Sequence, residues 1–131
     1  MIDITIPIRP VPKGRPRMTR AGHTYTPKAT ADFERKVREY VGLFVKSPLL
    51  GPLAVKMEFV LVPPKMSKKR TQQAYDGLIL PDKRPDLDNY EKGLLDSLNG
   101  VAYNDDAQIV KLGASKSYGP RDQIRLIIME V

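Results

Sequence analysis

The sequence predicts an α+β fold, a two-layer sandwich in which helices pack on one face of a mixed β-sheet. Two observations predict it. Segments with the alternating hydrophobicity of strands occur near both ends and in the middle of the chain, and segments with helical spacing lie between them. The expected order is β-α-β-(short α)-α-β-β. The chain has 131 residues, 41% of them hydrophobic, which suits one core, so we predict a single domain over residues 1–131.

The first part of the chain predicts a strand, a basic loop and a helix. Isoleucines alternate with other residues from Ile2 to Ile8, and Pro7 indicates that this strand ends there or lies at an edge. The segment from Arg9 to Tyr25 is rich in Pro, Gly and Arg without an apolar period, which predicts a loop. Thr26-Pro27 has the pattern of an N-cap and first helical position, and apolar residues at three-to-four spacing extend the helix to about Lys46.

The remainder predicts a strand, two helices and two strands. Residues 53–61 alternate as a strand does, and Pro63-Pro64 ends it. Ser67 is expected to cap a short polar helix through Tyr75. A further helix is expected to begin with Asp88 as its cap and to stop at Asn99-Gly100. Residues 106–117 and 122–130 are expected to be strands joined as a hairpin around residues 118–121.

Composition excludes several classes of function. The chain has no cysteine, so disulfides, Cys-ligated zinc and thiol catalysis are excluded. His23 is its one histidine, which argues against His-rich zinc sites and imidazole-based triads. No apolar run approaches the roughly 20 residues that span a bilayer, and the start lacks the features of a signal peptide. We therefore expect a cytoplasmic protein that does not contact membranes.

Charge is distributed unevenly along the chain. The formal net charge is +7, but residues 9–46 carry ten Lys or Arg against three acids, whereas residues 80–106 carry three against seven. A strongly basic chain most often binds a polyanion, although a high pI can also serve solubility alone. The pattern indicates phosphate attraction in the first region and metal binding in the second.

The acidic region holds the strongest chemical pattern. In an extended segment Asp86 and Asp88 point the same way, so that two hard oxygen ligands face one volume, as Mg²⁺ coordination requires. Lys92 lies one helical turn beyond Asp88, within reach of a phosphate or a water. The alternatives are that Asp88 is a simple N-cap and that Lys92 is a surface partner of Asp88 or Asp96.

A second acidic pair follows a turn. Asp105 and Asp106 stand just before an expected strand, and an Asn-Asp-Asp cluster is often turn chemistry only. Consecutive residues in an extended chain face opposite ways, so we expect one of the two to reach the metal.

Four cations of the basic loop are candidate DNA contacts. Arginine donates two hydrogen bonds to a phosphate in a fixed geometry, and Pro and Gly separate these residues; the alternative is a solvated surface. His23 suits a loop position or a phosphate contact better than a general base. The run at residues 68–70 is expected to be solvated. The candidate cations are Lys13, Arg15, Arg17 and Arg20.

Together these motifs resemble the RusA family of Holliday junction resolvases. The resemblance rests on Arg84-Pro85-Asp86-Leu87-Asp88-Asn89 with Lys92, on the segment from Leu94 to Leu98, and on the segment from Asn104 to Val110. Pro-Val-Pro-Lys-Gly-Arg-Pro-Arg near the start, with residues 23–27, is similar to phage and prophage members of that family. The resemblance covers nearly the whole chain, and a host or prophage gene would both fit it.

The resemblance implies a homodimeric endonuclease that cuts four-way DNA junctions with Mg²⁺, or Mn²⁺ in its place, and without a small-molecule cofactor. It implies metal-binding carboxylates at Asp86, Asp88 and Asp106 and an essential lysine at Lys92. It also marks Asn89 and Asp105 as further candidates. The family's bacterial prototype has arginine where this chain has Pro85, so Arg84 is expected to take the place of that DNA contact.

Two other functions fit the same residues. One is a less selective branched-DNA or flap nuclease that uses the same metal site. The other is a basic structural DNA-binding protein whose acids only cap helices and turns.

Overall fold

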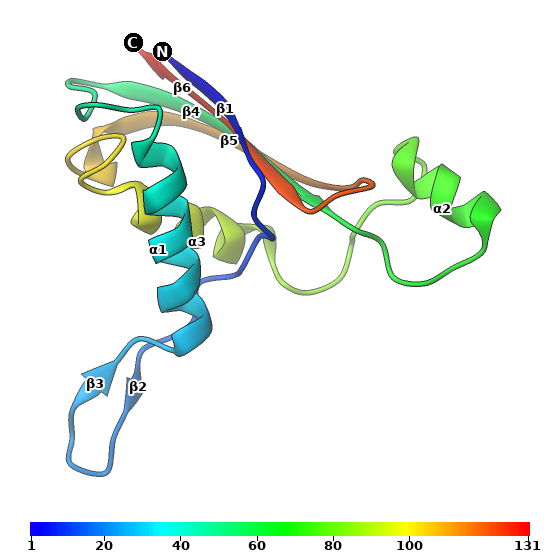
Figure 1. The fold of residues 1–131 in the computed structure, drawn as a ribbon, viewed down its shortest axis with the longest axis horizontal. Helices are drawn as coiled ribbons and strands as arrows, with labels where there is room; N and C mark the ends of the chain where they lie inside the picture. The colour runs from blue at the N-terminus through cyan, green and yellow to red at the C-terminus, as the bar shows by residue number, and fades with distance from the viewer.

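The computed structural model describes residues 1–131 and has an α+β fold with a four-stranded mixed sheet and helices on one side of it (Figure 1). This confirms the predicted fold class. The elements, in chain order, are β1 (Ile2–Ile6), β2 (Arg17–Met18), β3 (Thr24–Tyr25), α1 (Lys28–Gly42), β4 (Leu53–Leu61), α2 (Lys68–Tyr75), α3 (Leu87–Leu98), the 3₁₀ turn η1 (Asp106–Gln108), β5 (Ile109–Tyr118) and β6 (Gln123–Glu130).

The sheet has the strand order β1-β6-β4-β5. β4 pairs parallel with β5 and antiparallel with β6, so β4 separates the last two strands. The predicted β5–β6 hairpin is therefore wrong: the turn exists, but it crosses the end of β4. At this crossing the Gly119 N–H donates to the Leu61 carbonyl at 2.9 Å. A Cβ on Gly119 would lie 2.5 Å from Cγ1 of Val60, so only glycine fits there.

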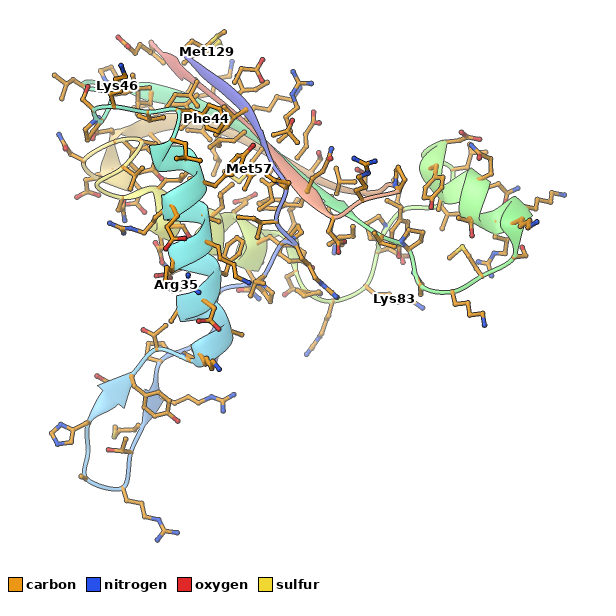
Figure 2. The ribbon with its side chains drawn as sticks, viewed as in Figure 1. Arg35, Phe44, Lys46, Met57, Lys83 and Met129 are labelled. Atoms are coloured by element: carbon orange, nitrogen blue, oxygen red, sulfur yellow. The ribbon has the colours of Figure 1, made fainter.

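The core lies between the sheet and two helices. α1 and α3 pack against each other and cover one face of the sheet (Figure 1). Met57, in the middle of β4, lies between the sheet and α1 (Figure 2). Because strand side chains alternate, the odd-numbered residues of β4 face the helices and the even-numbered ones face the other side. The buried side chains at the centre of this core are Phe33, Val37, Val41, Val55, Phe59, Leu94 and Leu98.

Two segments project from this body. The ribbon formed by β2 and β3 extends beyond the first turn of α1, and α2 extends beyond the opposite end of the sheet (Figure 1). The segment from Arg9 to Tyr25 is thus not a loop throughout, as predicted. The Thr19 N–H donates to the His23 carbonyl at 2.8 Å, and Gly22 turns the chain with φ 83°. Strands of two residues leave no alternation for a sequence to reveal.

The helix ends differ from the sequence expectation in three places. α1 has Pro27 at its N-cap rather than Thr26, and it ends at Gly42 rather than near Lys46. α3 has Asp86 at its N-cap rather than Asp88. The cap of α2 is confirmed, because Oγ of Ser67 accepts from the Arg70 N–H at 3.2 Å. None of the helices combines the length and the apolar character needed to cross a membrane.

Candidate active site

α3 arranges the first group of charged side chains. Asp86 precedes the helix and Asp88 lies in its first turn, where the helix dipole favours negative charge. The argument from extended-chain alternation is therefore wrong for this pair, although both side chains are exposed at the same helix end. Asp88, Lys92 and Asp96 follow at intervals of four residues and share one face of α3.

A lysine from the edge strand holds the segment before α3. The Lys116 Nζ donates to the carbonyl of Lys83 at 2.8 Å and to the carbonyl of Pro85 at 2.9 Å. The peptide bond between Arg84 and Pro85 is cis. The two hydrogen bonds fix the backbone on both sides of Arg84 and so place Asp86, the next residue after Pro85.

The second acidic pair has divided roles. The carboxylate of Asp105 accepts from the Ala107 N–H at 3.0 Å and closes a capping box with Gln108, so the turn alternative holds for this residue. The bond from Ala107 lowers the pKa of Asp105. A side-chain hydrogen bond with Asp105 raises the pKa of Asp106, with a smaller contribution from burial. The backbone of Asp106 is held by Oδ1 of Asn99 at 3.0 Å, and its side chain does not serve the turn.

Asp106 lies toward the middle and end of α3. The charges of Asp96 and Lys92 both act on the pKa of Asp106, the first raising it and the second lowering it. Lys92 Nζ lies 3.4 Å from Oδ2 of Asp96. The surface pairing considered for Lys92 with Asp96 is therefore present, and the same ammonium group lies on the side of Asp106.

Lys13 has partners inside the protein. Its Nζ lies 2.8 Å from Oε1 of Glu34 and 3.1 Å from Oδ2 of Asp96, and its side chain is 23% exposed. Burial alone would lower the pKa of Lys13, but the hydrogen bonds and charges of Glu34 and Asp96 raise it above the usual value. These contacts give Lys13 a structural role, which distinguishes it from the other predicted DNA contacts.

The segment that carries Lys13 lies directly on α3. The Lys13 N–H donates to the Asn89 carbonyl at 3.0 Å. A Cβ on Gly93 would lie 3.0 Å from the Val11 carbonyl oxygen, so a glycine in α3 admits this close backbone approach.

The remaining predicted cations are exposed and separate into two groups. Arg15, Arg17, Arg20 and His23 lie on or beside the projecting ribbon, and Arg84 lies next to the acidic segment. The structure therefore brings Arg84 to the acids of α3 and leaves the ribbon outside that group.

The comparisons with known proteins agree with these motifs. Residues 7–129 match the family described as Endodeoxyribonuclease RusA. The chain belongs to this family. It is also 35% identical to Uncharacterized protein YqaN of Bacillus subtilis (strain 168), in an alignment that covers 99% of this chain and 96% of that protein. The region matched to RusA includes α3, η1 and the loop held by Lys116, so the acidic group lies within a DNA-cleaving family's shared region.

In this RusA chain the carboxylates do not form a ready metal cage. No three of its Asp, Glu and His side chains come together as a group that could hold a metal ion. The donor chemistry nevertheless suits Mg²⁺, because the predicted ligands are all carboxylates and Asp86 and Asp88 form no ion pair that would compete for them.

Sequence reasoning missed three acids near this site. Glu34 and Asp96 bind Lys13, and Glu91 has its pKa raised by burial and by the charge of Asp88. Asp96 could be recognised by its spacing of four from Lys92, but Glu34 is brought in from α1 by tertiary packing, for which the sequence has no local pattern.

Proposed function

We propose that this RusA chain is an Mg²⁺-dependent endonuclease, active also with Mn²⁺, that resolves four-way DNA junctions by symmetric paired nicking during recombination and repair. The observation that carries this proposal is the family match over residues 7–129, which contains the acids of α3 and Asp106 together with Lys92. The exposed cations of the ribbon support it, because a branched DNA presents phosphates over a wide area.

The residues divide the work by their chemistry. Asp86, Asp88 and Asp106 would hold the metal ion, which supplies a Lewis acid for the scissile phosphate and an acidic bound water. Lys92 would stabilise negative charge that develops on the phosphoryl oxygens. Asp96, 3.4 Å from Nζ of Lys92, positions that ammonium group on the side of Asp106.

A two-fold dimer suits a four-way junction, because it presents two identical sites to two symmetry-related strands. Attack on phosphorus with departure of the 3′ oxygen leaves a 5′ phosphate and a 3′ hydroxyl. Paired nicks of this kind can be ligated.

The test is cleavage of a synthetic four-way junction beside a matched duplex, with and without Mg²⁺. We expect symmetric nicks in the junction that require Mg²⁺, and an at least 100-fold slower reaction for Asp88→Asn, in line with the loss of a charged group at a reacting phosphate. Asp76→Asn is the matched control, because it removes the same charge from the exposed end of α2.

Three results would contradict the proposal in different ways. Equal rates on junction and duplex would favour a less selective branched-DNA or flap nuclease. An Asp88→Asn variant that binds and behaves as the wild type would favour a structural DNA-binding protein. Failure of the wild type to bind the junction would remove the proposed substrate.

A further inference from the structure

A polar pocket of about 500 Å³ lies beside the acidic segment, at the end of the sheet. Four segments that are far apart in sequence form its walls: the chain after β1, the end of β4, the loop before α3 and the connection between β5 and β6. Lys83 lies on the loop between α2 and α3, next to this end of the sheet (Figure 2). The polar and aromatic side chains in the lining are Arg9, Lys83, Arg84, Tyr90, Tyr118 and Asp122.

The pocket is positively charged. Arg9, Lys83 and Arg84 are exposed, and none of them forms an ion pair. Asp122 is the one carboxylate in the lining, and its Oδ1 already accepts from the Val62 N–H at 2.9 Å. Three cations around one small volume repel one another unless an anion lies between them, so the pocket favours a negatively charged ligand.

The aromatic side chains give the pocket a fixed wall. The ring of Tyr90 is stacked on Phe59, with centroids 5.3 Å apart, and is almost completely buried. Arg9 and Asp122 act on its pKa in opposite directions, which places the Tyr90 hydroxyl near both groups. Tyr118, from the end of β5, is partly exposed. A nucleotide suits such a site, because its phosphate matches the arginines and its sugar and base can contact tyrosine.

The pocket and the acids share one short piece of chain. Pro85 lines the pocket, and Asp86 is the next residue. Two residues span at most about 7 Å, so a phosphate bound by Arg84 has a neighbouring linkage of the same strand near Asp86. The hydrogen bonds from Lys116 to the carbonyls of Lys83 and Pro85 keep this spacing constant.

We propose that this pocket binds the nucleotide next to the scissile linkage, with its phosphate held by Arg9 and Arg84. This inference rests on the proposed nuclease function and assigns the path of the cleaved strand. Arg9 is separated from the acidic motif by 75 residues of sequence and reaches the pocket only because the chain after β1 passes beside α3. Neither Arg9 nor Tyr118 belongs to a motif that the sequence revealed.

The first experiment measures binding without cleavage. A fluorescein-labelled four-way junction is titrated in EDTA with wild type, Arg9→Gln, Arg84→Gln and the double variant, at several salt concentrations. We expect each single variant to bind about 3- to 30-fold more weakly and to lower the slope of log K against log [salt] by about 1. Lys111→Gln is the control, because it removes a positive charge from the sheet face opposite the helices and should leave the slope unchanged.

The second experiment identifies the phosphate. Single uncharged methylphosphonate linkages are placed at each position within three nucleotides of the cleavage point. For the linkage next to the scissile one, the loss of affinity seen with wild type should disappear in the Arg9→Gln variant, because the contact is already absent. Thermal unfolding of each variant should match wild type, since the replaced side chains are exposed and unpaired.

The outcomes separate the two proposals. Additive losses at every linkage, or unchanged affinity in the double variant, would overturn the pocket assignment while leaving the nuclease proposal intact. Absence of junction binding by wild type would instead contradict the proposed function itself.

Discussion

Lys13 shows how one side chain can connect two helices to the candidate site. Its ammonium group binds Glu34 of α1 and Asp96 of α3, and Asp96 in turn lies 3.4 Å from Nζ of Lys92. The four charges alternate in sign, so each carboxylate has a cation beside it. Removing Lys13 would leave two partly buried carboxylates facing each other across the α1–α3 contact.

We therefore expect Lys13→Met to lower the free energy of unfolding by about 1–3 kcal/mol, because the change leaves partly buried charges uncompensated. Thermal and urea denaturation measure this difference. Lys111→Met, at an exposed position, is the matched control and should change stability little. Equal stability of Lys13→Met and wild type would show that the ion pairs do not hold the helices together.

The same stabilisation depends on pH in a defined direction. The pKa of Lys13 is raised in the folded protein above its usual value of 10.5, so folding favours the protonated amine. Its contribution is complete below pH 10.5 and is lost as the pH rises through the higher folded-state pKa. The difference in stability between wild type and Lys13→Met should thus be constant from pH 7 to about pH 9 and shrink above pH 10.5.

At the scale of elements, the loop before α3 depends on β5. Lys116 is the one side chain that hydrogen-bonds to the carbonyls on both sides of Arg84. If these bonds keep Asp86 in place, an uncharged residue of similar length should loosen the loop while β5 stays paired with β4.

We expect Lys116→Met to lower the cleavage rate about 10-fold and to raise the Mg²⁺ concentration for half-maximal cleavage, with a much smaller change in junction affinity. Single-turnover kinetics and binding in EDTA separate these quantities. Limited proteolysis should show faster cutting within residues 80–86. Lys56→Met, on the exposed face of β4, serves as control, and an unchanged Mg²⁺ requirement would argue against the positioning role.

The sequence allowed most elements to be predicted, because their patterns are local. Alternation in β4 and the apolar spacing of α3 survive in the structure with nearly the predicted bounds. The β5–β6 pairing could not be predicted correctly, because a turn motif shows that the chain reverses but not that β4 lies between the two strands. The cap of α3 was misplaced by two residues, since Asp86 and Asp88 are equally good capping residues by type.

The candidate site divides in the same way. Asp88, Lys92 and Asp96 follow from helical spacing, and the turn role of Asp105 follows from its Asn-Asp-Asp context. The pairing of Lys13 with Glu34 joins residues 21 positions apart, and its pairing with Asp96 joins residues still further apart. Such pairs arise from the packing of the Lys13 segment on Gly93 of α3, which leaves no periodic pattern.

At the scale of the whole molecule, the acids and the basic ribbon lie on different parts of the protein. The acids belong to the helical layer, and the ribbon projects beyond α1 (Figure 1). This arrangement suits a DNA with several arms, because one part of the protein can contact an arm while another faces the scissile strand.

Replacing Arg15, Arg17 and Arg20 together with glutamine should therefore weaken junction binding and lower the salt dependence by up to about 3 phosphate contacts, without changing the melting temperature. These side chains are exposed and form no ion pair, so the fold does not depend on them. At saturating DNA the cleavage rate should stay near that of wild type. A slow variant at saturation would instead place the ribbon in the chemical step.

The strand order also sets a condition on synthesis. β6 lies between β1 and β4, so its eight residues supply the hydrogen bonds that join the first strand to the rest of the sheet. Until Gln123–Glu130 has left the ribosome, β1 has no partner and one edge of β4 stays open. During translation the nascent chain must therefore keep two unpaired strand edges from aggregating, and the sheet closes only when the last strand inserts between them.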